Sequence, residues 1–305
     1  MTAHSSVERR NPEPPTRHER IPAAIMYMIA ATAIFSFSVA ASKWLVASYP
    51  VGEVLFFRSF ISLALFTAFV VPVQGLNVFR TARPGAHLLR GISQTVSQTL
   101  QLIALGLMPI AGVTAINFSA PLFATLASLH FLKEPVGVKR WMALAAGFVG
   151  VLIIANPGAE TFQIGALYAL ASAVLFGTVT AGVRGMTSTE SAETLTLYQL
   201  ILLASFYSVT LPFAFVTPSW TDAPLFLANG ATAVLGQYWW TRALHLAPTS
   251  AVVPFQYLSL IWAMIIGFAV WGDLPTASLL VGSAIVVGSG LFLLWRESRL
   301  RAPPP

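Results

Sequence analysis

The sequence predicts an all-α integral membrane protein with ten transmembrane helices, arranged as two inverted five-helix repeats with both termini in the cytoplasm. Three observations predict this fold class. The 305 residues are 56% hydrophobic and only 9% charged, whereas soluble domains carry about 25% charged residues. Ten apolar segments are each long enough to cross a bilayer, which takes about 20 residues. The chemistry of the first half of the chain also recurs in the second half.

The composition also argues against several classes of protein. Cysteine is absent, so disulfides and thiolate metal sites cannot form. The sequence has no G-x-S-x-G, H-E-x-x-H or phosphate-loop motif, and its five histidines are scattered near helix ends and tails. We therefore expect no enzymatic activity, no cofactor and no metal. The net charge of +6 does not by itself indicate a nucleic-acid partner, because in a membrane protein the distribution of basic residues matters more than their sum.

The predicted elements follow in order along the chain. Residues 1–20 are polar, charged and proline-rich, which predicts a disordered cytoplasmic tail. This tail lacks the features of a signal peptide. We expect the first five-helix repeat at residues 21–155, the second at residues 164–296 and a cytoplasmic tail at 297–305. Turn residues separate the ten predicted spans, which cover residues 22–47, 51–73, 86–108, 110–131, 137–155, 164–185, 193–216, 223–244, 249–271 and 276–296.

The basic residues set the predicted orientation. With the N-terminus in the cytoplasm, Lys43 lies near the outer end of a helix and Arg58 lies within one. The other fifteen basic residues then fall on the inner side, as the positive-inside rule requires. They are Arg9, Arg10, Arg17, Arg20, Arg80, Arg83, Arg90, Lys133, Lys139, Arg140, Arg184, Arg242, Arg296, Arg299 and Arg301.

An internal repeat relates the two halves through two ungapped alignments. In the first alignment, "ALGLMPIAGVTAINF" (104–118) matches "ALHLAPTSAVVPFQY" (243–257), and Glu134 matches Asp273. The second alignment relates the first two helices to the sixth and seventh, and in it Lys43 matches Arg184. Five helices are an odd number, so the second copy enters the membrane from the opposite side, as in many secondary transporters. A chance alignment of apolar sequence is the alternative interpretation.

A polar stripe runs along the third predicted helix. Gln94, Ser97, Gln98 and Gln101 are spaced i, i+3, i+4 and i+7, which places them on one helical face. Amides that face lipid would each cost several kcal/mol, so this face should look inward. It either bonds across a packed helix interface or lines a water-filled cavity. We favour the cavity because three glutamines share the stripe.

The repeat places polar residues at matching positions in both halves. In the first alignment, Gln98 matches Gln237, Gln101 matches Trp240, and Asn117 matches Gln256. In the second, the pair Phe57 and Arg58 matches Tyr198 and Gln199. A substrate site between the two halves accounts for these symmetric pairs. We predict that it is lined by Gln94, Gln98, Gln101, Asn117, Gln237, Trp240, Gln256, Tyr257, Arg58, Tyr198, Gln199 and Ser36.

Arg58 has two possible roles. Its planar fork matches a carboxylate, so it could bind an acidic group of the substrate. It could also extend toward the outer interface. Glu53, five residues earlier, is either a partner of Arg58, a proton site, or a residue of the outer interface. By contrast, the predicted spans 137–155 and 276–296 carry small residues and no buried amides. They are typical of packing or dimerisation elements outside the cavity, and we leave a monomer and a homodimer open.

The sequence resembles the drug/metabolite transporter superfamily, in its ten-helix branch of paired EamA-type repeats. The resemblance rests on "FFRSFISLAL" (56–65), on the stretch from Ala104 to Gly158, and on "TRALHLAPTSAVVPFQYLSLIWAMIIGFAVWGDLP" (241–275). In similar proteins, helices 1–4 and 6–9 enclose the cavity while helices 5 and 10 stand outside it. The resemblance covers residues 22–296.

The resemblance implies a multi-pass protein of the bacterial inner membrane and looks closest to amino-acid exporters. We therefore expect a secondary transporter that exports neutral or aromatic amino acids, or similar small metabolites, by alternating access. The expected partners are a small-molecule substrate and the lipid bilayer. Relatives that move riboflavin, S-adenosylmethionine, nucleotide-like compounds or drugs leave another substrate open. A structural membrane subunit is the alternative from another class.

Overall fold

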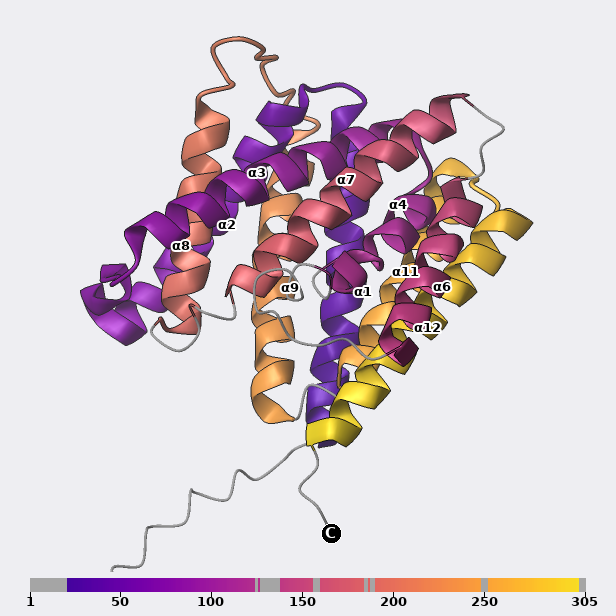
Figure 1. The fold of residues 1–305 in the computed structure, drawn as a ribbon. Coiled ribbons are helices and arrows are strands. Elements are labelled where there is room, and N and C mark those ends of the chain that lie inside the picture. The colour runs from indigo at the N-terminus through magenta and orange to yellow at the C-terminus, as the bar shows by residue number, and fades with distance from the viewer. Residues whose placement is uncertain are drawn as a thin grey trace, which may run out of the picture.

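The computed structural model describes residues 21–123, 126, 138–155, 160–183, 186, 190–247 and 252–301, and the described elements are all helical. The predicted tail 1–20 lies outside these ranges, as do Lys133, Glu134, Arg184 and Pro248. The elements in order are α1 (Ile21–Val46), α2 (Val51–Gln74), the 3-10 helix η1 (Gly75–Phe79), α3 (Pro84–Leu107), α4 (Ile110–Asn117), α6 (Val138–Ala155), α7 (Glu160–Val183), α8 (Ala192–Ser208), α9 (Ala223–Leu246), the 3-10 helix η2 (Val253–Tyr257), α11 (Leu258–Trp271) and α12 (Ala277–Arg301) (Figure 1).

Local chemistry explains where several helices begin and end. Pro50 and Pro109 precede α2 and α4, and the Ser191 hydroxyl caps α8 by accepting a hydrogen bond from the Thr194 amide. Gly272 closes α11 with φ of 70°, a left-handed conformation that glycine adopts without strain. Each of the ten α-helices of the described ranges overlaps one of the ten predicted segments.

Two details of the prediction are wrong. The predicted span 193–216 ends early, because α8 stops at Ser208. Pro212 has no N–H to donate to the Ser208 carbonyl four residues earlier, and the Thr210 hydroxyl instead bonds the Tyr207 carbonyl at 2.7 Å. The predicted spans 110–131 and 249–271 are not continuous α-helices either, since each contains an interruption that we describe below.

Three helical stretches of the described ranges are long and apolar enough to cross a membrane by length and composition: Ile21–Val46, Val51–Phe79 and Pro254–Trp271. Four shorter apolar stretches accompany them, namely Ile110–Phe123, Trp141–Ala155, Ile164–Thr178 and Ala277–Phe292. Helices α3 and α9 have 24 residues each, about 36 Å of helix. Their polar residues lower their hydropathy.

The helices alternate in direction along the bundle. In Figure 1, α1 begins and α12 ends at the bottom of the view, and each helix runs opposite to the one before it. Helix α7, the sixth in this order, therefore runs opposite to α1. We call the end at which α1 begins the inner end and the opposite one the outer end.

Packing between the halves follows a two-fold pattern. Gly91 of α3 faces Leu202 of α8, and Gly230 of α9 faces Ile61 of α2. A Cβ atom at Gly91 would lie 2.7 Å from a Leu202 methyl, and one at Gly230 would lie 2.6 Å from the Ile61 Cβ. The two alignments found in the sequence relate one pair to the other, glycine to glycine and leucine to isoleucine. When each helix is replaced by its equivalent in the other half, the α1–α9 contact becomes the α3–α7 contact, and the α1–α11 contact becomes the α4–α7 contact.

Helices α6 and α12 pack closely along each other. At their crossing, a Cβ atom at Gly150 would lie 2.8 Å from the Gly282 carbonyl oxygen, and one at Gly282 would lie 2.6 Å from the Gly150 carbonyl oxygen. Small residues let two backbones approach in this way. The small residues that predicted a packing role for these two helices thus join them to each other.

Candidate substrate-binding site

Two helices of the bundle are interrupted at matching positions. Helix α4 ends at Asn117, Phe118 and Ser119 form a turn, and helical structure resumes at Ala120. In the second half, the 3-10 helix η2 covers Val253–Tyr257 before α11 begins. The first alignment of the repeat matches Asn117 with Gln256. Interrupted helices in corresponding positions of two repeats mark the binding site of many transporters.

Nearby hydroxyl groups satisfy the backbone at both interruptions. The Ser119 hydroxyl donates to the Ile116 carbonyl at 2.6 Å, and the Ser259 hydroxyl donates to the Gln256 carbonyl at 2.8 Å. The Phe118 amide keeps its bond to the Thr114 carbonyl at 3.2 Å. A helix can be interrupted within a membrane only where its freed backbone groups find such partners.

The two interruptions lie side by side. Phe118 and Tyr257, which are equivalent in the two halves, contact each other with ring centroids 4.7 Å apart and planes tilted by 51°. Helix α4 also packs against α11. Gly290 of α12 leaves room for the Tyr257 ring, because a Cβ atom there would clash with its hydroxyl. Equivalent residues that touch must lie at the two-fold axis of the repeat, so Asn117 and Gln256 flank this axis.

The polar stripe of α3 divides into two kinds of residue. Ser97 is 2% exposed, and its hydroxyl bonds the carbonyl and the hydroxyl of Ser172 of α7 at 3.0 and 3.1 Å. The Ser172 hydroxyl also donates to the Ser97 carbonyl at 2.8 Å. Ser97 joins two helices. Gln94 is 8% exposed, whereas Gln98 and Gln101 are half-buried. Gln237, the equivalent of Gln98, is also half-buried.

Six of the predicted amides have no hydrogen-bond partner for their side chains within the described part of the chain. Among the residues that the structure describes, no side-chain hydrogen bond is made by Gln94, Gln98, Gln101, Asn117, Gln237 or Gln256. Amides that join helices would be hydrogen-bonded to groups of neighbouring helices. Their free donors and acceptors are available to a polar ligand.

Ser36 and Trp240 are held by the protein. The Ser36 hydroxyl donates to the Ser259 carbonyl at 3.4 Å, which links α1 to α11 just after η2. The Trp240 ring packs against a small apolar cluster that includes Ala24 and Met28. Ser36 therefore supports the interruption in the second half, and Trp240 packs α9 against α1.

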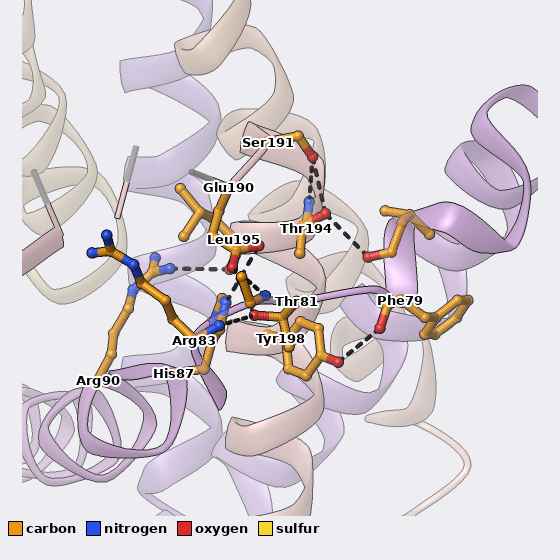
Figure 2. Close-up of polar contacts among 12 residues, drawn as sticks. Phe79, Thr81, Arg83, His87, Arg90, Glu190, Ser191, Thr194, Leu195 and Tyr198 are labelled. Carbon is orange, nitrogen blue, oxygen red and sulfur yellow. Dashed lines mark hydrogen bonds and ion pairs between the residues drawn. The ribbon is translucent and has the colours of Figure 1, made fainter. Parts of the chain in front are cut away.

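Tyr198 and Gln199 lie elsewhere, near the inner end of the bundle. The Tyr198 hydroxyl donates to the Phe79 carbonyl at 2.8 Å, and the Gln199 amide oxygen accepts a hydrogen bond from the Arg90 guanidinium at 2.5 Å. Arg90 also donates to the Leu195 carbonyl at 3.0 Å (Figure 2). These contacts favour a structural role for both predicted residues. Sequence reasoning missed Arg90 as part of the polar face, although it stands four residues before Gln94 on the same side of α3.

Arg58 lies half-buried on α2, near the hydroxyl of Tyr207 of α8. That hydroxyl donates to the Thr95 carbonyl at 2.9 Å. Glu53 is not its partner, because the Glu53 carboxylate is fully buried and accepts a hydrogen bond from the Val216 amide at 2.9 Å. Within the described ranges, Arg58 makes no ion pair, so its guanidinium is available for a ligand.

Comparisons with known proteins identify the family. A model of the EamA-like transporter family matches the chain twice, at residues 22–156 and 163–295. The chain is 30% identical over 261 residues to an S-adenosylmethionine uptake transporter of Rickettsia conorii, covering 85% of this chain and 87% of that protein. It is 29% identical over 282 residues to a riboflavin transporter of Rhizobium johnstonii, covering 92% and 93%.

A solved crystal structure shares the fold, with a TM-score of 0.62 and 18% identity over 92% of this chain and 99% of the other. The relatives' names do not carry the expected amino-acid specificity. They agree better with the alternative that the resemblance left open, a transporter of another small metabolite. The two matches and the relatives place the chain, a multi-pass membrane protein, in the EamA-like transporter family of the drug/metabolite transporter superfamily.

Proposed function

We propose that the protein transports S-adenosylmethionine, or a metabolite of the same chemical type, by alternating access around the two interrupted helices. The observation that carries this proposal is the similarity to S-adenosylmethionine uptake transporters, which extends over 85% of the chain. The site chemistry supports it independently. This substrate combines an adenine ring, an amino-acid group and a sulfonium cation.

Each part of that molecule has a suitable group in the candidate site. The unpaired amides of Gln98 and Gln237 can both donate to and accept from the edge of an adenine ring. Arg58 can bind the carboxylate through its fork. The paired rings of Phe118 and Tyr257 offer aromatic faces that attract a cation. We propose that the substrate lies between these groups, at the two-fold axis.

Riboflavin is the second candidate, because riboflavin transporters align with up to 92% of this chain. Its flavin ring also presents donors and acceptors that amides could bind. It has no carboxylate and no cation, however, so Arg58 and the aromatic pair would have no specific role. Amino-acid export, the main expectation from the sequence, remains a third substrate class for the same assay.

The test is uptake of radiolabelled S-adenosylmethionine into liposomes that contain the purified protein. Riboflavin, methionine and other amino acids serve as competitors, and uptake is measured with and without a pH gradient. We expect saturable uptake that Gln98→Ala and Gln237→Ala both reduce. Gln74→Ala is the matched control, because Gln74 is exposed at the end of α2.

Two results would contradict the proposal. Saturable riboflavin uptake without S-adenosylmethionine uptake would favour the second candidate. S-Adenosylmethionine uptake that is unaffected by both glutamine variants at matched protein levels would place the binding site elsewhere.

A further inference from the structure

A network of hydrogen bonds at the inner end of the bundle joins the segment between α2 and α3 to the start of α8. The Glu190 carboxylate accepts hydrogen bonds from the Thr81 hydroxyl at 2.8 Å and the Ala82 amide at 2.9 Å. The Thr194 hydroxyl donates to the Val78 carbonyl at 3.1 Å. Figure 2 shows Thr81, Glu190 and Thr194 converging from the start of α8 and from the segment between α2 and α3. We call Glu190 and Thr194, with the segment Val78–Ala82 that they hold, the inner latch.

Three residues of the inner latch are buried. Val78, Glu190 and Thr194 are each no more than 8% exposed. His87 of α3 is 2% exposed, and its Nε2 atom lies 4.0 Å from the Glu190 carboxylate. Buried polar groups of this kind hold one arrangement firmly when their partners are in place.

A second network lies at the outer end, where residues at the start of α2 bond the segment that precedes α9. The Ser219 amide donates to the Tyr49 hydroxyl at 3.0 Å, and that hydroxyl donates to the Asp222 carboxylate at 2.7 Å. The Val216 amide donates to the Glu53 carboxylate at 2.9 Å. We call Tyr49 and Glu53, with the segment Val216–Asp222 that they hold, the outer latch.

The two latches occupy equivalent positions in the repeat. Tyr49 and Glu190 each directly precede the residue that caps a helix, Pro50 for α2 and Ser191 for α8. Glu53 and Thr194 are each the third residue of that helix, and the second alignment of the repeat matches both pairs. The chemistry differs between the halves, but the same two positions hold a loop in each.

The segments that the latches hold are also equivalent, and each leads into a helix of the candidate site. The inner segment ends just before α3, which begins at Pro84, and the outer segment ends just before α9, which begins at Ala223. The first alignment of the repeat matches these two starting residues. Helices α3 and α9 carry Gln98 and Gln237. Each latch therefore fixes the end of a helix that carries an unpaired amide.

We propose that the two latches are the gates of the transport cycle, with Glu190 and Thr194 closing the inner end and Tyr49 and Glu53 closing the outer end. The hydrogen bonds of both latches are formed in this structure. Alternating access requires that one gate opens while the other stays closed. Opening a latch frees the first turn of α3 or α9. The proposal rests on the proposed transport function, but it does not depend on the substrate.

Distances between spin labels test the proposal without any substrate. The chain has no cysteine, so pairs of introduced cysteines label cleanly. Arg80→Cys with Glu193→Cys spans the inner latch, and Ser48→Cys with Trp220→Cys spans the outer latch. These pairs avoid the residues that form the latch bonds. Pulsed electron resonance in liposomes then reports the closed and open populations of each end.

Removing one latch should open only its own end. We expect Glu190→Ala to increase the long-distance population of the inner pair by about fivefold for each hydrogen bond lost, with no opening of the outer pair. Tyr49→Phe should increase the long-distance population of the outer pair, with no opening of the inner pair. Glu190→Gln should stay close to the parent, because the amide oxygen still accepts both hydrogen bonds. Thr196→Val is the matched control, since the Thr196 hydroxyl bonds only the Ala192 carbonyl of its own helix.

Unchanged distances in both Glu190→Ala and Tyr49→Phe would overturn the proposal, as would opening of both ends by either variant. Thr81→Val, which removes a single latch bond, replaces Glu190→Ala if that variant does not fold. A second measurement links the latches to transport. A short thiol cross-linker joining Arg80→Cys to Glu193→Cys should stop transport until it is reduced, whereas the single-cysteine variants should still transport. Full transport by the cross-linked protein would show that the inner latch does not open during transport, and would overturn the proposal. If S-adenosylmethionine uptake fails, the distance measurement still tests the latches, because it needs no substrate.

Discussion

Replacing Asn229 with alanine should destabilise the bundle, whereas replacing Asn117 should impair transport and leave stability nearly unchanged. Asn229 of α9 is fully buried. Its amide oxygen accepts hydrogen bonds from Ser38 at 2.7 Å and Ser42 at 3.3 Å, and its amide nitrogen donates to Ser42 at 3.0 Å. Asn117, by contrast, is half-buried at the end of α4.

The size of the effect follows from these bonds. Hydrogen bonds between membrane helices contribute roughly 0.6 kcal/mol each. Losing the three that Asn229 makes to α1 should therefore cost about 2 kcal/mol, or roughly a thirtyfold change in the ratio of folded to unfolded protein. Asn117→Ala breaks no described side-chain bond, so we expect a change of less than about 0.5 kcal/mol.

The assay is reversible unfolding of the purified protein in mixed detergent micelles, followed by the fluorescence of its eight tryptophans. Uptake into liposomes is measured on the same two variants. A loss below about 0.5 kcal/mol for Asn229→Ala would refute the reasoning from hydrogen bonds. Normal uptake by Asn117→Ala would refute the functional interpretation of the unpaired amides.

Four further predictions concern the symmetric pairs, Arg58 and the inner latch. Gln98→Ala and Gln237→Ala should each weaken apparent substrate affinity by about 5- to 150-fold in competition assays, and a change below twofold in both would contradict the cavity. Arg58→Lys should impair uptake nearly as much as Arg58→Ala, because an ammonium cannot reproduce the bidentate fork; full uptake by the lysine variant would contradict carboxylate binding. Gly91→Leu and Gly230→Leu should each destabilise the fold by about 1–3 kcal/mol in the unfolding assay, unlike Gly85→Leu, which meets open space. The Thr81 hydrogen bond holds the pKa of Glu190 below its ordinary value of 4.5, so the latch is stabilised above that pH and loosens only as the pH falls through the lowered pKa; opening between pH 7 and 6 in the spin-label assay would contradict the assignment to Glu190.

The sequence predicted the helices better than their interruptions. Apolar runs locate helices because a bilayer requires long apolar segments. The turn at Phe118 and Ser119 lies in equally apolar sequence, so hydropathy cannot detect it. Only the internal alignment singled out Asn117, Gln256 and the aromatic residue after each of them, which are the residues that flank the two breaks.

Contacts between distant loops could not be predicted. Spacing on a helix places Arg90 on the same face as Gln94, but it cannot show that the guanidinium bonds Gln199 of another helix. Tyr198 and Gln199 were assigned to the site because their position matched that of Arg58 in the repeat. The structure shows that equivalent positions in an inverted repeat can lie near opposite ends of the molecule, so the symmetry of the sequence does not imply a shared ligand.

The packing between the halves has a consequence for the two repeats as separate molecules. The closest helix pairs, α1 with α9, α3 with α7, α6 with α12 and α2 with α8, each join one half to the other. A single repeat expressed alone would therefore expose the surfaces that the other repeat covers. Two complementary half-chains, split between residues 155 and 160, should reassemble when they are made together. A lone half could satisfy those surfaces only by pairing with a second copy inserted in the opposite direction.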